Sequence, residues 1–392
     1  MSGHRVCILT GTRADWGILM PLAEALRDHP DIELSVVATN MHLSQLHGMT
    51  VNEIIHAGFS VDFRVPMHIV TDDAADRVAA MGQCMTGMTQ AFSKLKPDAV
   101  IILGDRFEML ASATAATMMR IPIIHIAGGT VSFGAVDDAI RHAITKLSSL
   151  HLVETDEHRH RVIQMGEDPS HVITAGALGV WNIMNRKLLS VKELADSLDG
   201  FTMDRNSTIL VTYHPATLDD TAPADSFRAL LDALDAFPDS KILISGANND
   251  AGGMAINAMI DDYAASNPER VKAVKSLGMQ RFLSAMSHAA VFVGNSSSGI
   301  VEAPSMGLPT VDIGNRQKGR QRAASVIHCE GDTASIIRAI KSAFTPEVQA
   351  IAAKRISPYY RPDTRQVMLK AILEFLNTKQ SPKTFNDLEW QS

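Results

Sequence analysis

The chain has 392 residues, of which 46% are hydrophobic and 20% charged, and its formal net charge is −7. This length exceeds a single typical core and predicts two domains in a globular protein. The acidic balance argues against a nucleic-acid-binding protein, and no apolar run approaches the length that spans a bilayer. The three cysteines lie far apart, at no metal-binding spacing, and the start lacks a signal-peptide layout. Both features lead us to expect a cytoplasmic protein.

Short strand-like runs alternate with longer helical patterns in the first half of the chain. The predicted strands are RVCILT, ELSVVAT, DAVIILG, IPIIHIA and HLVET. Between them, residues 17–28 and 74–95 carry apolar side chains at helical spacing. Several strands are apolar at consecutive positions, as strands buried on both faces must be. The alternation is typical of an α/β protein with a parallel, doubly wound sheet.

The second half repeats this pattern, with predicted strands STILVTY, SKILISG, AAVFVG and LPTVDIG. We therefore expect one Rossmann-like domain over residues 1–180 and another over 205–360, joined by a polar helical stretch. The amphipathic segment within 361–392 is expected to pack back on the first domain. Two such domains facing each other would bind a ligand in the cleft at the carboxyl ends of their strands.

The first two strand ends of interest carry GTRADWG and GDRFE. The first lacks the GxGxxG pattern, which argues against a nicotinamide enzyme. Its Arg13 suits a phosphate group, or pairs with Asp15 on the surface. Asp105 of GDRFE either caps the next helix or takes part in acid–base chemistry.

A glycine pair ends the strand IPIIHIA, and the helical segment VDDAIRHAITKL follows it. Asp137 and Arg141 are four residues apart on one helical face, as are Asp138 and His142. These residues form either a capping cluster or a pair of carboxylates with tuned pKa values.

The second half places polar and glycine-rich sequence after each strand, in YHP, GANNDAGG, GNSSSG and GNRQKGR. The GNSSSG stretch is either an anion site at a helix N-terminus or an ordinary capped turn. A carboxylate near a ribose, with donors around a diphosphate, is typical of nucleotide binding. The candidate residues at these ends are His214, Asn248, Ser296, Ser297, Glu302 and Arg316.

Taken together, RADWG, GDRFE, DDAIRHAITKL, YHP, GNSSSG and GNRQKGR resemble the hydrolysing UDP-N-acetylglucosamine 2-epimerases of bacterial sialic and legionaminic acid synthesis. The resemblance runs in order from Arg5 to about His328. It implies a GT-B-like fold of two Rossmann-like domains, UDP bound mainly by the second, and no metal or other cofactor. It also implies a homodimer or homotetramer.

The implied reaction converts UDP-N-acetylglucosamine and water to UDP and N-acetylmannosamine, by elimination of UDP and hydration of the glycal. The resemblance implies Asp105, Asp137 and His214 as catalytic residues, Asp137 after a one-residue shift at Phe133. The implied substrate-binding residues are Arg13, His142, Asn248, Ser296, Ser297, Glu302 and Arg316.

The chain departs from the family pattern at the glycine pair, where Ala127 and Thr130 stand at positions that are acidic in the sialic-acid members. The first is a catalytic carboxylate in the family. Asp138, His125 or a water held by Thr130 are candidates for the missing role. The C-terminal SPYYRPDT also lacks the family's glycine-rich turn.

Four alternatives remain open at this stage. The first is a hydrolysing 2-epimerase that acts on a UDP-2,4-diacetamido-trideoxyhexose. The others are a non-hydrolysing epimerase, against which IRHAITKL speaks, a GT-B glycosyltransferase, and a UDP-sugar binder without activity, which Ala127 and Thr130 would explain.

Overall fold

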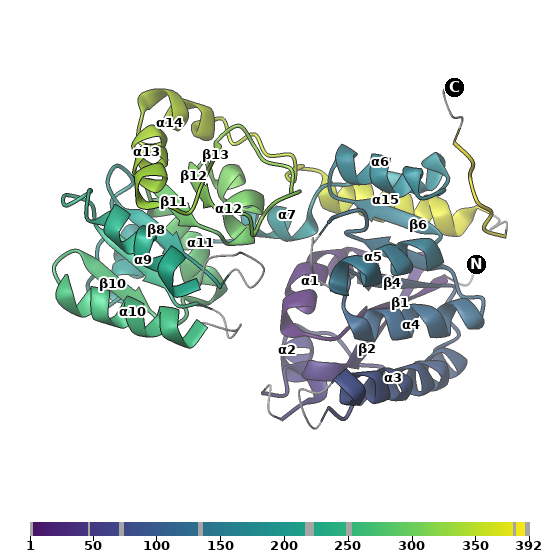
Figure 1. Cartoon of the computed structure of the whole chain (residues 1–392). Coiled ribbons are helices and arrows are strands. Elements are labelled where there is room, and N and C mark those ends of the chain that lie inside the picture. Colours follow the sequence, from purple (N-terminus) through teal and green to yellow (C-terminus); the bar gives the residue numbers. More distant parts are fainter. Residues whose placement is uncertain are drawn as a thin grey trace. The chain divides into compact units, whose positions relative to one another are not determined.

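The computed structural model describes residues 3–45, 48–69, 74–131, 136–215, 223–247, 253–378 and 382–388. The chain forms two compact units: unit 1 comprises Met1–Asn182 and Arg361–Ser392, and unit 2 comprises Ile183–Tyr360. Each unit contains a parallel β-sheet with helices on both faces (Figure 1), which confirms the predicted α/β class. Within the described ranges, no helix is long and apolar enough to cross a membrane.

The sheet of unit 1 has seven strands in the order β3-β2-β1-β4-β5-β6-β7, and every pairing is parallel. Strand β1 has β2 on one side and β4 on the other, so the strand order reverses direction there. The strands are β1 (His4–Thr10), β2 (Ile32–Thr39), β3 (Phe63–Val65), β4 (Ala99–Leu103), β5 (Ile123–Ile126), β6 (Leu150–Val153) and β7 (Val172–Thr174).

Helices cover both faces of this sheet, and the unit boundary falls within α7 (Leu178–Met184), between Asn182 and Ile183. Two short 3₁₀ segments, η1 (Asn40–Leu43) and η2 (Pro169–His171), complete the unit. The helices are α1 (Arg13–Arg27), α2 (Val51–His56), α3 (Ala74–Leu95), α4 (Phe107–Met118), α5 (Val136–Leu147), α6 (Asp156–Gln164) and α15 (Thr364–Asn377).

Alternate residues of β1 belong to two separate cores, because successive side chains of a strand point to opposite faces. Val6 and Ile8 pack with residues of α1, α2 and α15. Cys7 and Leu9 pack with residues of α3, α4 and α5 on the other face. All four are fully buried, which explains why this strand is apolar at consecutive positions.

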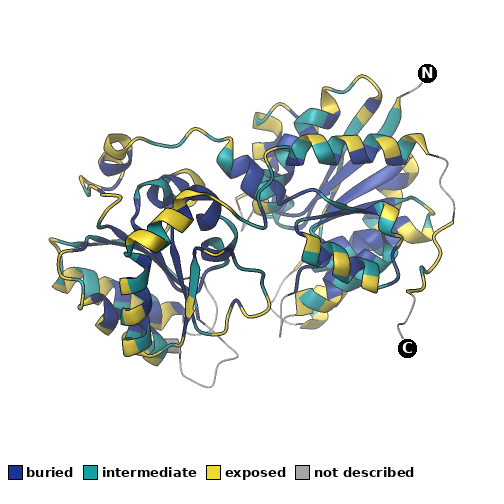
Figure 2. Cartoon of the chain, turned by 90° about the horizontal axis from the view of Figure 1, so that it is seen from above, coloured by how far each residue is buried: buried dark blue, intermediate teal, exposed yellow. Residues whose placement is uncertain are grey.

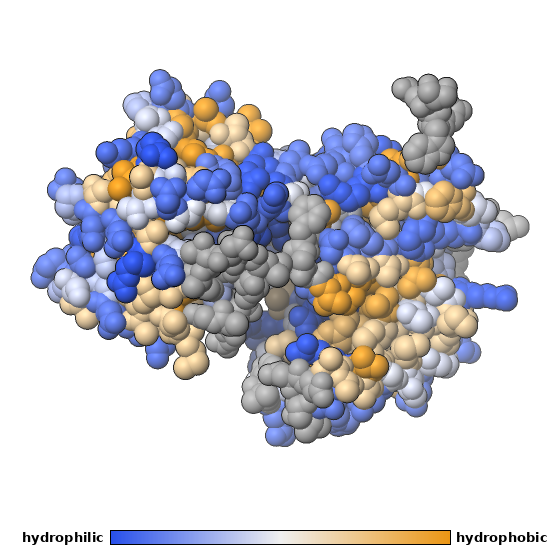
Figure 3. All heavy atoms as spheres, viewed as in Figure 1, coloured by the Kyte–Doolittle hydropathy of each residue, from blue (hydrophilic) through white to orange (hydrophobic). Residues whose placement is uncertain are grey.

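The methionine-rich helix α3 is largely a core element. Its buried residues follow the helical period and lie on the face that packs against α4 and the sheet. Val78, by contrast, is exposed, as is Met118 of α4. Figure 3 shows apolar side chains over α3 and α4 on the face in view. The buried residues of α3 are Ala80, Cys84, Met88, Ala91 and Phe92.

Unit 2 has a six-stranded parallel sheet in the order β10-β9-β8-β11-β12-β13. Its strands lie in the buried interior, whereas the outer helix faces are exposed (Figure 2). The strands are β8 (Ile209–Thr212), β9 (Ile242–Ser245), β10 (Val271–Val274), β11 (Val291–Gly294), β12 (Thr310–Ile313) and β13 (Val326–Cys329). The helices are α8 (Val191–Asp196), α9 (Pro223–Leu234), α10 (Gly253–Ser266), α11 (Gly278–His288), α12 (Ser297–Val301), η3 (Ala303–Met306), α13 (Thr333–Ala343) and α14 (Pro346–Ala353).

Four strands were not predicted from the sequence: β3, β7, β10 and β13. All four are the edge strands of the two sheets. An edge strand has a neighbour on one side only and needs fewer apolar residues. Strand β13, for example, contains the exposed His328 within the sequence VIHC.

The chain returns to unit 1 at its C-terminal end, where α15 packs against α1 (Figure 1). Met368 and Ile372 of α15 are fully buried in the same core as Leu22 of α1. Two hydrogen bonds fix the entry of this segment: Trp181 Nε1 donates to Pro362 O at 2.9 Å, and Arg361 donates to Thr174 O at 3.0 Å.

The segment 382–388 also docks on unit 1, through a buried charged cluster. Lys383 Nζ donates to the carbonyl oxygens of Lys146 and Ser148 at the end of α5, at 2.7 and 2.6 Å. The same ammonium lies 2.7 Å from Glu167, which also accepts hydrogen bonds from Lys146 at 2.6 Å and His151 at 2.9 Å. Burial opposes ionisation of Glu167, but its three donors outweigh burial and lower its pKa to about 2.

We predict that Lys383→Met lowers the free energy of unfolding by about 1–3 kcal/mol at pH 7, because it removes a charged donor from a buried carboxylate. The contribution of Glu167 is fully present above its unfolded pKa of 4.5 and is lost as the pH falls toward 2. Urea unfolding measures the difference. Lys370→Met is the control, since Lys370 is exposed and makes only a 3.7 Å pair with Glu374. Equal losses in the two variants would contradict the prediction.

Candidate active site

In unit 1 the candidate residues lie at the carboxyl edge of the sheet. Arg13 begins α1 after β1, Asp105 follows β4, and the glycine pair Gly128 and Gly129 follows β5. Strands β1 and β4 are neighbours at the point where the strand order reverses, which is where open α/β sheets bind ligands.

Asp105 pairs with the guanidinium of Arg141, which comes from α5. Arg141 is 5% exposed and also donates to the carbonyl oxygen of Thr130 at 2.8 Å. Its second carboxylate neighbour is Asp138, at 3.7 Å, three residues earlier on the helix. Within α5, the carboxylate beside Arg141 is therefore that of Asp138. The four-residue spacing had favoured Asp137. The structure brings Asp105 and Arg141 together although 36 residues separate them.

A second charged group lies beside Asp105, around Arg106. Its Nε donates to Glu108 at 2.5 Å. Burial by itself would lower the pKa of Arg106. The carboxylates of Glu108, Asp15 and Asp137 have the opposite and larger effect, so the pKa of Arg106 is raised. Glu108 is fully buried, and a side chain at Gly11 would collide with it, since a Cβ there would lie 2.5 Å from Glu108 Oε1.

Burial also raises the pKa of Asp15, and Arg106 opposes that rise. The sequence analysis assigned no role to Arg106 or Glu108, although both lie in the GDRFE motif. Arg106 and Glu108 come close to Asp15 and Asp137 because three strands end at the same edge of the sheet. A single sequence motif cannot show this proximity.

His125 is buried completely in the middle of β5, with both ring nitrogens engaged. Nε2 lies 2.8 Å from the carbonyl oxygen of Gly104, the residue before Asp105, and Nδ1 lies 3.2 Å from the Thr145 hydroxyl. Burial lowers its pKa to about 3. His125 therefore cannot take the acid role considered above. It holds the Asp105 turn against α5 as a neutral side chain.

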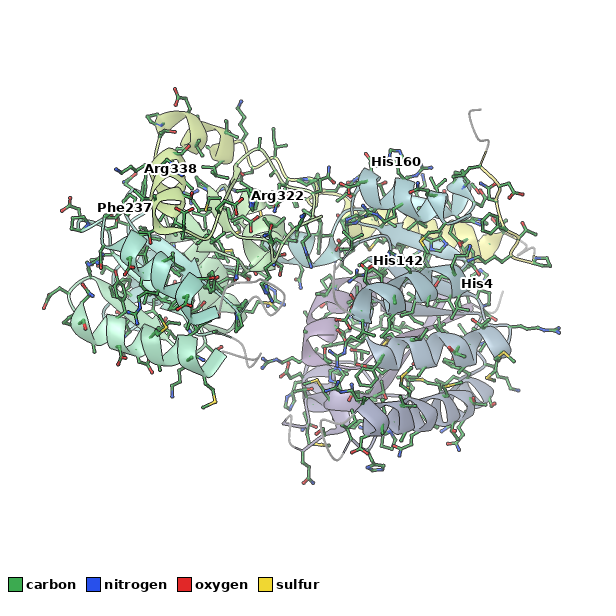
Figure 4. The ribbon with its side chains drawn as sticks, in the orientation of Figure 1. His4, His142, His160, Phe237, Arg322 and Arg338 are labelled. Atoms are coloured by element: carbon green, nitrogen blue, oxygen red, sulfur yellow. The ribbon has the colours of Figure 1, made fainter. Side chains whose placement is uncertain are left out.

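Asp137, Asp138 and His142 lie on the first turns of α5 (Figure 4 labels His142). His142 Nε2 lies 3.5 Å from Asp138 Oδ2, so the predicted four-residue pair is present. Asp137 is exposed at the start of the helix, whereas residues 132–135, including Phe133, lie outside the described residues.

Arg13 is largely exposed, and its guanidinium lies 4.0 Å from Glu53 rather than beside Asp15. Thr12 caps the helix by accepting a hydrogen bond from the Asp15 backbone N–H at 3.2 Å. The contact with Glu53 is at the limit for an ion pair, so it holds Arg13 only weakly.

In unit 2, Asn295 fixes the strand end that carries His214. Its Oδ1 accepts from the His214 backbone N–H, and its Nδ2 donates to the His214 carbonyl oxygen, both at 2.8 Å. Asn295 is 1% exposed. The preceding Gly294 has φ +149°, a conformation that lets its backbone approach Thr212 without a side-chain clash. The residues predicted from GNSSSG were its serines, and Asn295 was not among them.

A cavity of about 360 Å³ opens at the same edge of unit 2. His214 and Glu302 line it, together with Ser298 of α12. Ser296 caps α12 by accepting from the Ser298 N–H at 3.4 Å. The remaining lining residues are Ile183, Thr212, Ser245, Gly246, Lys275, Ser276, Leu277, Gly278, Met279, Phe282 and Leu283.

The other predicted residues of unit 2 are Arg316, Ser297 and Asn248. Arg316 is exposed after β12 and donates to the Asn295 carbonyl oxygen at 3.2 Å. Ser297 is the first residue of α12. Asn248 lies outside the described residues.

Two doubly wound parallel-sheet units, one with the Asp105–Arg141 pair at its strand ends and the other with a cavity there, have the architecture of GT-B-like nucleotide-sugar enzymes. The family model described as UDP-N-acetylglucosamine 2-epimerase matches residues 24–373. The protein therefore belongs to the UDP-N-acetylglucosamine 2-epimerase family, which confirms the resemblance seen in the motifs.

Individual relatives are similar over most of the chain. The GDP/UDP-N,N'-diacetylbacillosamine 2-epimerase (hydrolyzing) of Campylobacter jejuni is 37% identical over 84% of this chain and 85% of its own. The UDP-N,N'-diacetylbacillosamine 2-epimerase (hydrolyzing) of Legionella pneumophila is 36% identical over 87% and 89%. The crystal structure of the Neisseria meningitidis UDP-GlcNAc 2-epimerase bound to UDP-GlcNAc has a TM-score of 0.76 at 19% identity, covering 94% of this chain and 100% of that one. It supports the fold.

We predict that the stability of unit 1 falls as the pH drops below 6.5, because buried neutral histidines take up protons only on unfolding. Burial lowers the pKa of His125 to about 3 and that of His42 to about 4, against 6.5 for the unfolded chain. Each contributes a slope of up to about 1.4 kcal/mol per pH unit below 6.5.

His125→Gln should flatten the slope between pH 6.5 and 4.5, although it lowers stability at pH 7. His160→Gln serves as the control, since His160 is exposed on α6 (Figure 4). Urea unfolding at pH 7.0, 6.0 and 5.0 measures the slopes. An unchanged slope in the His125 variant would show that this histidine does not titrate on unfolding.

Proposed function

We propose that the protein is a hydrolysing 2-epimerase of UDP-2-acetamido sugars, which forms UDP and the free, 2-epimerised amino sugar. The observation that carries this proposal is the match over most of the chain to two relatives named as hydrolyzing 2-epimerases, at 36% and 37% identity. The pairing of Asp105 with Arg141 at the reversal point of the sheet agrees with it.

The chemistry needs a base at the weakly acidic C2–H and stabilisation of the departing diphosphate. In the elimination, the base takes the C2 proton, the C–H electrons form the C1=C2 bond, and the C1–O bond to UDP breaks. Asp105 and Asp137 are the acid–base candidates, and His214 stabilises the leaving phosphate. Water then adds across the double bond of the 2-acetamidoglucal.

UDP binding belongs mainly to unit 2 in this proposal. Ser296 and Ser297 donate to the diphosphate and Glu302 accepts from the ribose hydroxyls. Arg316 and Arg13 are the cationic groups for the phosphates, Asn248 contacts the nucleotide, and His142 contacts the substrate. The cavity of unit 2 combines an apolar wall with a few polar side chains, His214, Ser298 and Glu302, as small-molecule sites commonly do.

Two sugars are candidate substrates: UDP-N-acetylglucosamine and UDP-N,N'-diacetylbacillosamine, a UDP-2,4-diacetamido-trideoxyhexose. The names of the two relatives at 36% and 37% identity favour the second. The free amino sugar formed from either substrate would be a precursor in nonulosonic acid synthesis. The homodimeric or homotetrameric state stays a prediction.

We predict that the protein releases UDP and a free amino sugar from one of these substrates without any acceptor. Asp105→Asn should reduce the rate by about 100-fold or more, because it removes the carboxylate that takes the proton. Proton NMR with each UDP-sugar in turn follows both products. Activity that needs an added acceptor would identify a glycosyltransferase, and epimerised UDP-sugar without free UDP would identify a non-hydrolysing epimerase. Binding without turnover would leave a UDP-sugar binder.

We predict that Asn295→Ala weakens UDP binding by about 10-fold, because the His214 backbone loses the two hydrogen bonds that hold it. Calorimetry with UDP measures the affinity. Asn267→Ala is the control within unit 2: its side chain bonds to Tyr263 and Arg270 beside β10 and does not line the cavity. Equal affinities in the two variants would contradict the role of Asn295.

A further inference from the structure

A 2-epimerisation needs acid–base groups on two sides of one carbon atom. The proton leaves C2 from one face of the sugar and a proton is added to the opposite face, since the configuration inverts. One carboxylate cannot serve both faces of a fixed sugar. This argument rests on the proposed function, in which Asp105 stands beside C2.

The end of β5 is the natural place for the second group, yet its residue is Ala127. The neighbouring strands are held level with it by two backbone hydrogen bonds. The Gly104 N–H donates to Ile126 O at 3.0 Å on the β4 side, and the Ala127 N–H donates to Leu152 O at 3.1 Å on the β6 side. The register pairs Leu103 with Ile126 and Ile126 with Leu152.

Asp105 and Glu154 each follow a strand that flanks β5, two residues after Leu103 and Leu152, the register partners of Ile126. Neighbouring strands lie about 4.8 Å apart, so β4 and β6 are about 10 Å apart across β5. The segment between them carries no side chain larger than the methyl group of Ala127. Gly128 and Gly129 could not bear one without displacing their neighbours, since an added Cβ at Gly129 would lie 2.5 Å from His158 O.

Thr130 connects Glu154 to the Asp105–Arg141 pair. Its hydroxyl donates to Glu154 Oε2 at 3.4 Å, while its carbonyl oxygen accepts from Arg141 at 2.8 Å. His158 Nδ1, one turn further on α6, lies 3.7 Å from the same Glu154 oxygen. The side chain of Glu154 is 21% exposed, so it is shielded but reachable.

We propose that Glu154, rather than the exposed Asp137, is the second acid–base residue, and that it carries the carboxyl group that position 127 lacks. In the hydration, the protonated Glu154 gives its proton to C2 of the 2-acetamidoglucal, and the electrons of the C1=C2 bond form the new C2–H bond. Water then attacks C1, and the proton that this water loses restores Glu154. The proton that Asp105 took from C2 during elimination passes to solvent, which balances the hydrolysis.

Glu154→Gln tests the proposal, because glutamine keeps the size of the side chain and an acceptor for Thr130. The experiment is a single turnover with enzyme in excess over the UDP-sugar, followed by proton NMR. We expect UDP to form within about threefold of the wild-type rate, because elimination does not use Glu154. Formation of the free amino sugar should fall by about 100-fold, with the 2-acetamidoglucal accumulating. A structural role would not separate the two rates.

Three further variants complete the test. Glu157→Gln is the matched control on α6, since Glu157 pairs with Arg161 at 2.8 Å near the surface, and it should leave both rates unchanged. Glu154→Asp keeps the carboxyl group and should retain more sugar formation than Glu154→Gln. Ala127→Glu added to Glu154→Gln returns a carboxyl group to β5 and should restore sugar formation at least about tenfold.

The outcomes separate this inference from the proposed function. A wild-type protein that releases no UDP from either sugar refutes the proposed function itself. A working wild type whose Glu154→Gln variant forms free sugar normally, or loses UDP and sugar formation in parallel, overturns the role of Glu154 alone. Calorimetric UDP binding equal to that of the wild type shows that the variant is folded.

Discussion

The buried guanidinium of Arg141 joins segments that lie far apart in the sequence. It binds the carboxylate of Asp105 after β4, the carbonyl oxygen of Thr130 after β5, and Asp138 on its own helix. A buried cation without such partners would be strongly destabilising. The position of α5 and the two turns are therefore fixed together, and His125 adds a neutral link from Gly104 to Thr145. Protonation of Asp105 would weaken the ion pair, so the acid–base role proposed for this residue would be coupled to the electrostatics of the whole edge.

In unit 2 the strand ends are held together by a neutral side chain, the amide of Asn295. Asn295 satisfies both backbone polar atoms of His214, and its own carbonyl oxygen accepts from Arg316 and Gln317, at 3.2 and 2.9 Å. An amide suits this place because it donates and accepts at once, and it brings no charge next to a site for an anionic ligand. The first unit thus organises its strand ends with charged groups and the second with a neutral amide, which agrees with the proposed division between proton transfer and diphosphate binding.

The sequence predicts those parts of the fold that consecutive residues determine. The nine central strands are found because they are buried on both faces, while β3, β7, β10 and β13 are missed because an edge strand needs less apolar sequence. The strand ends are found for the same reason, and with them Asp105 and His214. The partners of those residues are not found. The pairs Asp105 with Arg141, His214 with Asn295, and Glu154 with Thr130 depend on which strands are neighbours, and no spacing along the chain encodes this.

Ala127 has a backbone conformation that is unusual for a residue other than glycine. It has φ +66°, a left-handed conformation that costs an L-residue about 1–2 kcal/mol. The conformation is imposed by the turn into Gly128 and by the hydrogen bond to Leu152, and not by the methyl group. A larger side chain at 127 would start from the same Cβ position, so a carboxyl group on β5 and one on β6 approach the glycine pair from neighbouring strands. If Glu154 has the proposed acid–base role, the carboxyl group follows β6 instead of β5, and the turn of Ala127, Gly128 and Gly129 lies between the two positions.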